Sequence, residues 1–220
     1  MGRRGRLIFS LDIEASGRIP GPYWMCSFGL CRTDDLSAGF TRRLKPLVIP
    51  GLSLPDDPEA LDVVAQGLPE LPRPTGTPPE RAAAVRAFFQ AQGVEPRQAL
   101  LELREWLSGQ CAGARPILMA SPLSFDFMWL YWYWWHLLEE MPAFGFAGLD
   151  LRSYFMGFHG VGPEAANKTV WHRLYPNDLP HTHDPLDDAR EQGKLWADMV
   201  AARSRLPRGP DGLGGVESPA

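Results

Sequence analysis

Residues 6–17, with the sequence RLIFSLDIEASG, constrain the chain most, because they place two carboxylates at the end of an apolar segment. The apolar residues predict a β-strand buried on both faces, and side chains two positions apart on a strand point to the same side. Asp12 and Glu14 therefore share a face. Two like charges roughly 6–7 Å apart beside apolar neighbours cost several kcal/mol unless a cation or hydrogen-bond donors compensate them. This arrangement indicates a functional site.

A plainer interpretation of the same segment remains open. The strand can end at Leu11, with both acids in a solvated turn that begins at the small residues Ala15, Ser16 and Gly17. A D-x-E pattern is short, so this segment alone does not decide between the two interpretations. Further carboxylates placed in the same way elsewhere in the chain would favour the functional one.

Composition and length limit the classes of protein to which this chain can belong. The chain has 220 residues, which suits one domain or one domain with a tail, and a net charge of −4, which argues against a broad electrostatic grip on nucleic acid. Its three cysteines, Cys26, Cys31 and Cys111, show no metal-type or redox spacing, so we expect reduced thiols in a cytoplasmic protein. No apolar stretch reaches the roughly 20 residues of a membrane span, so no membrane partner is expected.

The expected elements alternate in a way that predicts an α/β domain with a mixed sheet. Short connections join the first three strands into an antiparallel meander, and a strand that follows two helices adds a parallel neighbour. The predicted strands span residues 7–13, 23–32, 40–47 and 116–120, and residues 148–158 pass from a strand into a helix. The predicted helices span residues 79–90 and 96–108, a segment from about 126, and a segment from 185 to about 205.

Two segments fall outside these elements. Residues 49–79 are rich in proline and glycine and are expected to form a long irregular excursion with at most a short helix near 58–66. Loops of this length within a compact domain more often serve function than linkage. Residues 168–180 are also expected to be irregular. Glycine, proline and serine dominate residues 207–220, which predicts a disordered tail behind a domain of residues 1–206.

A third acid, Asp126, lies inside a dense run of aromatic residues between positions 125 and 135. In a helix that begins near Asp126, the face of Trp129 and Tyr133 lies on the same side as the carboxylate. Asp126 is thus a charge on an inward face, although a helix cap is the competing interpretation, with Ser124 a second cap candidate. Aromatic residues at helical spacing more often form a core or a subunit interface than a base-stacking surface, which leaves a homodimer open.

The last predicted helix carries a fourth acid. Asp184 and Pro185 fit an N-cap and a first helical residue, and Asp187 suits the third position. Asp188 has no such structural reason, because Gln192 continues its face at the edge of a packing surface. It lies shortly after a histidine at position 183. His159 and His172 are lone histidines in loop-like surroundings and are interpreted as surface or satisfied residues.

Together these acids predict a metal centre for phosphoryl transfer. Carboxylate oxygens suit Mg²⁺ or Mn²⁺, and two such ions can stabilise the attacking and leaving oxygens of an in-line displacement. A histidine beside them can act as the general base for the attacking water. The candidate residues are Asp12, Glu14, Asp126, His183 and Asp188.

In their order along the chain, these five residues resemble the motifs of the DEDDh-type 3′→5′ exonucleases of the ribonuclease-H-like superfamily. Their first motif, D-x-E, matches residues 12–14, and their second, an aspartate after an aromatic residue, matches Phe125 and Asp126. Their third motif, H-x4-D-A, selects His183 over His181 and Asp188 over Asp187. The stretches SFDFMWLYWYW, LDLRSY and HTHDPLDDAREQG further resemble a small bacterial subgroup of 3′→5′ exoribonucleases.

The resemblance implies a fold, a site and a substrate. The fold is a central mixed five-stranded sheet flanked by helices, and the four acids hold two divalent cations, Mg²⁺ or Mn²⁺, with Asp12 bridging them and His183 activating water. The residues expected to contact the substrate are Ala15, Ser16, Gly17 and Trp129. The implied partners are single-stranded 3′ ends, with RNA favoured over DNA, and the products are nucleoside 5′-monophosphates.

The sequence leaves other functions open. Residues 121–124 read SPLS where family members often carry His-Asn, which together with the excursion puts substrate contacts in question. A DNA-directed exonuclease fits the same residues. So does a non-catalytic module that binds a nucleic-acid end or a protein, although no acid is missing. A metal-dependent phosphatase or endonuclease would use the same acids without predicting the H-x4-D spacing.

Overall fold

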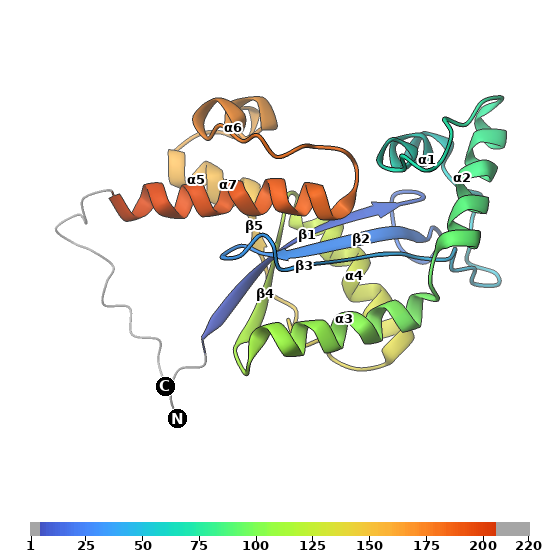
Figure 1. Ribbon diagram of the computed structural model, residues 1–220, viewed down its shortest axis with the longest axis horizontal. Coiled ribbons are helices and arrows are strands. Elements are labelled where there is room, and N and C mark those ends of the chain that lie inside the picture. The colour runs from blue at the N-terminus through green and yellow to red at the C-terminus, as the bar shows by residue number, and fades with distance from the viewer. Residues whose placement is uncertain (1–4, 206–220) are drawn as a thin grey trace.

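The computed structural model describes residues 5–205, so the predicted tail at 207–220 lies outside the described residues. Its centre is a five-stranded sheet in the order β3-β2-β1-β4-β5, shown in Figure 1. The strands are β1 (Arg6–Ala15), β2 (Met25–Arg32), β3 (Gly39–Arg43), β4 (Arg115–Ala120) and β5 (Leu149–Asp150). The helices are α1 (Pro58–Val64), α2 (Pro78–Gln92), α3 (Pro96–Cys111), α4 (Leu123–Leu138), α5 (Leu151–His159), α6 (Lys168–Leu174) and α7 (Pro185–Arg205), with 3-10 turns η1 (Ala65–Gly67) and η2 (Pro163–Ala165).

The first strand occupies the middle of the sheet, as its apolar residues on both faces require. It pairs antiparallel with β2 and parallel with β4, which confirms the predicted meander and the mixed sheet. Phe9, Leu11 and Ile13 are buried, and the strand continues to Ala15. The interpretation in which the strand ends at Leu11 is therefore wrong, and both acids belong to the strand.

Helices cover both faces of the sheet (Figure 1). Helix α7 packs along β1 and β2 on one face, where α5 and α6 accompany it, and α3 and α4 lie on the opposite face. The main core forms between the sheet and α3 and α4, with the fully buried Leu100, Leu103 and Trp129 among its members. The helices within residues 5–205 lack the length and apolarity needed to cross a membrane.

The proline-rich excursion has more structure than its composition predicts. It contains α1 where the sequence allowed a short helix, followed by η1, and both pack with α2 at one end of the sheet. A separate small core, which includes Trp24, Val64, Leu68 and Phe89, holds these elements together. The excursion is thus an ordered layer with its own buried side chains.

Residues 168–174 form the helix α6, so the prediction of an irregular segment there is wrong. Asn167 caps the helix, because its side chain accepts a hydrogen bond from the backbone of Val170. Trp171 is 5% exposed and packs in the cluster under α5 and α7. The helix is only seven residues long, and tertiary packing of one aromatic side chain stabilises it where the sequence pattern is too short to predict it.

Candidate active site

The four predicted acids come from three elements that meet beside the end of β1. Asp12 and Glu14 lie on β1, Asp126 lies in the first turn of α4, and Asp188 lies in the first turn of α7. One carboxylate oxygen from each of Asp12, Glu14 and Asp188 lies within 4.8 Å of the other two. Glu14, Asp126 and Asp188 are 9%, 4% and 2% exposed and Asp12 is partly exposed, so the group is a largely buried cluster of like charges.

Asp126 joins this cluster through the backbone of the strand. Its Oδ1 accepts a hydrogen bond of 2.9 Å from the amide of Ile13, the residue between the two acids of β1. This bond fixes the start of α4 against the strand. Pro122, not Asp126, occupies the N-cap of α4, so the helix-cap interpretation of Asp126 is wrong.

The electrostatics of the cluster are unfavourable without a bound cation. Burial raises the pKa of Asp12 well above its usual range, and the charges of Asp126, Glu14 and Asp188 raise it further. Burial likewise raises the pKa of Glu14, Asp126 and Asp188. Within residues 5–205, no lysine or arginine forms an ion pair with any of the four acids. In this part of the chain, the groups at ion-pair distance from the four acids are histidines, His181 beside Asp188 and His183 beside Glu14.

This donor set fits divalent metal ions. Carboxylate oxygens are the ligands that hard divalent cations prefer, and three of them converge from two elements here. Gln192 orients one of them, because its Nε2 donates a hydrogen bond of 3.0 Å to Oδ1 of Asp12. Deprotonated, converging and oriented carboxylates are what such an ion requires.

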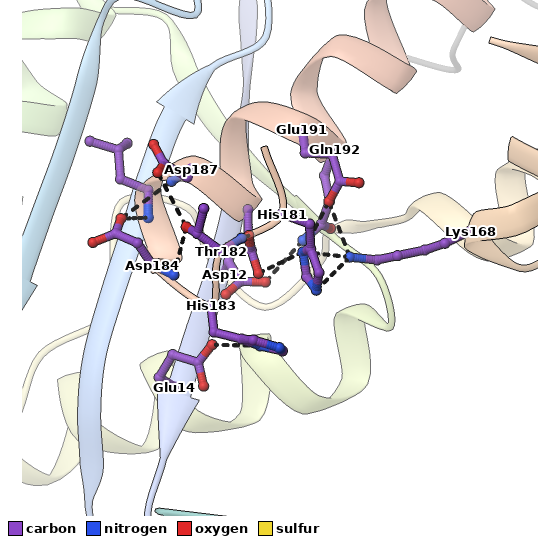
Figure 2. Close-up of polar contacts among 12 residues, drawn as sticks. Asp12, Glu14, Lys168, His181, Thr182, His183, Asp184, Asp187, Glu191 and Gln192 are labelled. Carbon is purple, nitrogen blue, oxygen red and sulfur yellow. Dashed lines mark hydrogen bonds and ion pairs between the residues drawn. The ribbon is translucent and has the colours of Figure 1, made fainter. Parts of the chain in front are cut away.

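His183 lies in the loop before α7, next to Glu14 (Figure 2). Its Nδ1 is 3.8 Å from Oε1 of Glu14, which is an ion-pair distance and longer than a hydrogen bond. The facing Glu14 carboxylate raises the pKa of His183, whereas partial burial opposes the shift. The side chain is 30% exposed, so the ring is also accessible to solvent.

A second histidine and three further residues border the site, and sequence reasoning did not place them there. His181 Nδ1 lies 2.9 Å from Oδ2 of Asp188 and 3.2 Å from Oε2 of Glu191. Glu191 also pairs with Lys168 at 3.1 Å, as Figure 2 shows, and with His172 at 2.8 Å. The one local signal for Glu191 is its position three residues after Asp188 on α7, which puts both on neighbouring parts of one helix face.

The structure buries all four residues that were predicted to contact the substrate. Trp129 is fully buried and packs on Phe125 and Tyr133, so its ring belongs to the core and offers no surface to a base. Ser16 is also fully buried, and its N–H and Oγ both bond to Trp24 while its carbonyl accepts from Asp57. Each polar atom of Ser16 therefore has a hydrogen-bond partner within the protein.

The other two positions follow the same pattern. A side chain on Gly17 would overlap the ring of Tyr23, so packing explains the glycine. Ala15 is 7% exposed and pairs with Met25 in the sheet. The small residues after the D-x-E motif therefore serve the close packing of the strand end, and little of their surface reaches the site.

Comparisons with known proteins extend these observations. No family model matches the chain. Over 205 residues, covering 92% of this chain and 97% of the relative, it is 26% identical to the 3′-5′ DNA exonuclease Cap18 of Escherichia coli. Among solved structures, the nuclease domain of 3′hExo, a DEDDh family member bound to rAMP, matches with a TM-score of 0.64 at 15% identity, covering 91% of this chain and 94% of that one.

A second structural neighbour is larger. The zinc-bound complex of Escherichia coli ExoI with single-stranded DNA matches with a TM-score of 0.55 at 14% identity, covering 93% of this chain and 42% of that one. The mixed five-stranded sheet with flanking helices in this chain, together with its match to these structures, confirms the predicted fold class. The resemblance drawn from the motifs is confirmed in class and fold: the chain is similar to a 3′-5′ exonuclease and has the ribonuclease-H-like fold of the DEDDh exonucleases. The assignment of Asp12, Glu14, Asp126, His183 and Asp188 to the motif positions stays a prediction.

Proposed function

We propose that the protein is a metal-dependent 3′→5′ exonuclease that hydrolyses single-stranded nucleic acid to nucleoside 5′-monophosphates. One observation carries the proposal: carboxylates from separate elements converge to within 4.8 Å in a buried cluster that no lysine or arginine of residues 5–205 neutralises. The comparisons bear out the predicted class, because the curated relative is a 3′-5′ exonuclease and the structural neighbours include a DEDDh exonuclease.

The four acids hold two divalent cations, for which Mg²⁺ or Mn²⁺ is the proposed identity, since the cluster offers oxygen ligands. Such a pair supplies charge stabilisation for both the attacking and the leaving oxygen of an in-line displacement. Asp12 contributes from the middle of the cluster, where the charges of the other three acids act on it. Gln192 keeps the Asp12 carboxylate in place by its hydrogen bond.

His183 acts as the general base. Glu14 faces Nδ1 of the ring, which leaves Nε2 as the atom that takes the proton of the attacking water. The base must be neutral to accept a proton. Because the pKa of His183 is raised above its usual value of 6.5, the neutral form predominates only at a pH above the raised pKa.

We propose single-stranded DNA as the preferred polymer. The relative that this chain matches over nearly its whole length is named a DNA exonuclease. The sequence resemblance favoured RNA, and that preference stays a prediction without support from the curated relative. The 3′hExo neighbour, bound to rAMP, keeps RNA as the second candidate.

The test uses 5′-labelled DNA and RNA oligonucleotides of one sequence, each with a 3′-hydroxyl or a 3′-phosphate, incubated with Mg²⁺ or Mn²⁺. We expect a ladder that shortens one nucleotide at a time from the free 3′-hydroxyl, faster on DNA. Internal fragments from both end types would indicate an endonuclease. Binding without hydrolysis would indicate a non-catalytic module. Asp12→Asn serves as the inactive control.

A further inference from the structure

The turn η1 of the proline-rich excursion lies directly against the loop that carries His183. A Cβ built on Gly67 would overlap the carbonyl group of His183 and approach the amide of Asp184 to 2.9 Å. Gly67 does not have a left-handed φ, so this position needs glycine for space and not for conformation. Figure 1 shows the segment entering α7 beside α1, beyond the end of β1.

The backbone of His183 is held in an unusual conformation. Its φ of 59° lies in the left-handed region, which non-glycine residues adopt only where their surroundings hold them. On the α7 side, the loop is held because Thr182 donates its amide to Oδ1 of Asp188 at 3.0 Å. On the other side, the same loop meets Gly67. The two contacts enclose the His183 backbone between α7 and η1.

The rest of the protein holds η1 in place, so η1 can constrain the His183 loop. Val64 and Leu68, which flank η1, are 2% and 5% exposed and pack into the small core with Trp24 and Phe89. Arg86 on α2 pairs with Asp56 at 2.6 Å, just before α1 begins. The position of η1 is therefore set by buried side chains and an ion pair that do not involve the site.

The same segment also reaches the strand that carries the first two acids. The amide of Asp57 donates a hydrogen bond of 3.0 Å to the carbonyl of Ser16, two residues after Glu14. Residues 57–67 thus contact the chain just after Glu14 through Asp57, and the loop of His183 through Gly67. Glu14 and His183 face each other at 3.8 Å between these contacts.

We infer that residues 57–67 set the distance between His183 and Glu14, with Gly67 as the positioning residue. The inference rests on the proposed function, in which His183 is the general base. A methyl group at position 67 would push the His183 backbone away and move the ring from its place beside Glu14. Displacements of about 1 Å at a reacting group can cost on the order of 100-fold in rate.

The first experiment compares Gly67→Ala with Gly109→Ala. Gly109 lies in α3 with open space where a Cβ would be, so it is a matched control for adding one methyl group. We expect Gly67→Ala to lower kcat about 100-fold with KM and Mn²⁺ affinity unchanged. Gly109→Ala should keep the wild-type values. An unchanged kcat in a folded Gly67→Ala protein would overturn the inference.

A double variant separates positioning from general loss of packing. If Gly67 acts through His183, then Gly67→Ala added to His183→Ala lowers kcat no further, whereas independent effects multiply. Val64→Ala is a milder second variant, because it loosens the anchor of η1 without adding bulk. It should lower kcat several-fold in the wild-type protein and not at all in His183→Ala. Multiplying effects would overturn the inference.

A third readout does not depend on hydrolysis and so distinguishes failure of this inference from failure of the proposed function. The chain has five histidines, and comparison with His183→Ala assigns the ring-proton NMR signals of His183. In Gly67→Ala, those signals and their titration midpoint should shift, while Gly109→Ala leaves them unchanged. Unshifted His183 signals in Gly67→Ala would overturn the inference even if the protein degraded no nucleic acid.

Discussion

Two buried carboxylates on α7 lie three residues apart and differ in the charges that surround them. Glu191 is 4% exposed and is surrounded by basic side chains, with Lys168, His172 and His181 all within 3.2 Å of its oxygens. Asp188 is 2% exposed and faces the acids of β1. The first carboxylate belongs to a compensated cluster, and the second to a cluster with an excess of negative charge.

The difference separates structural charge from functional charge. Removing a partner from a buried ion pair is costly, so a carboxylate that only stabilises the fold is found with its cations, as Glu191 is. A carboxylate that receives a cation from solution must lack a paired lysine or arginine, as Asp12 does among residues 5–205. His181 touches both Asp188 and Glu191 and thus joins the two clusters. Substitutions in each cluster should therefore differ in their effects on hydrolysis and on stability.

The largest effect is expected from Asp12→Asn, which removes one charge from the uncompensated cluster. It should lower the rate of hydrolysis by roughly 10³-fold or more, because metal-ion stabilisation is worth several kcal/mol. The metal-free variant should be as stable as the wild type or more so, since the substitution relieves repulsion among like charges. Nuclease assays and urea unfolding in EDTA measure the two quantities. An unfolded variant or an active one would contradict the metal assignment.

The next largest effect is expected from His183→Ala, which should lower the rate of hydrolysis by roughly 10²–10⁴-fold with little change in Mn²⁺ affinity. His181→Ala should cost less, because that ring contacts Asp188 and Glu191 and does not face Glu14. Parallel kinetics and Mn²⁺ titrations of the two variants provide the comparison. A larger rate loss in His181→Ala than in His183→Ala would indicate that His181 is the general base.

Glu191→Gln should affect stability more than chemistry. The amide keeps the size of the side chain but leaves Lys168 and His172 without their carboxylate, at a cost of about 1–2 kcal/mol in the free energy of unfolding. Equilibrium unfolding in urea measures this loss. A stability gain like that expected for Asp12→Asn would show that the two clusters do not differ.

The pH dependence of metal-free stability should show the smallest and most specific effect. Because the folded state raises the pKa of Asp12, its carboxyl group favours folding while protonated, and this contribution is lost as pH rises from its ordinary value of 3.8 through the raised pKa. The stability advantage of Asp12→Asn over the wild type should therefore be absent below pH 3.8 and grow as pH increases. Unfolding curves in EDTA at a series of pH values test this. A constant difference would remove the electrostatic explanation.

The sequence by itself determined which residues could form the metal-binding cluster. Asp12 and Glu14 share one face of β1 whatever the rest of the chain does, because side chains alternate along a strand. Helical spacing places Asp126 and Asp188 on inward faces in the same local way, and the structure finds both buried. These features depend on neighbours within a few positions, which the sequence shows directly.

Only the tertiary structure decided which charges are compensated and what surrounds the site. Lys168 and Glu191 are 23 positions apart, and their pairing depends on α6 packing against α7, which no local pattern predicts. Trp129 was expected to contact substrate and is a core residue, because the sheet covers the helix face that carries it. Gly67 and His183 meet across more than a hundred residues of chain, and their contact exists only because a separate small core holds η1 in place.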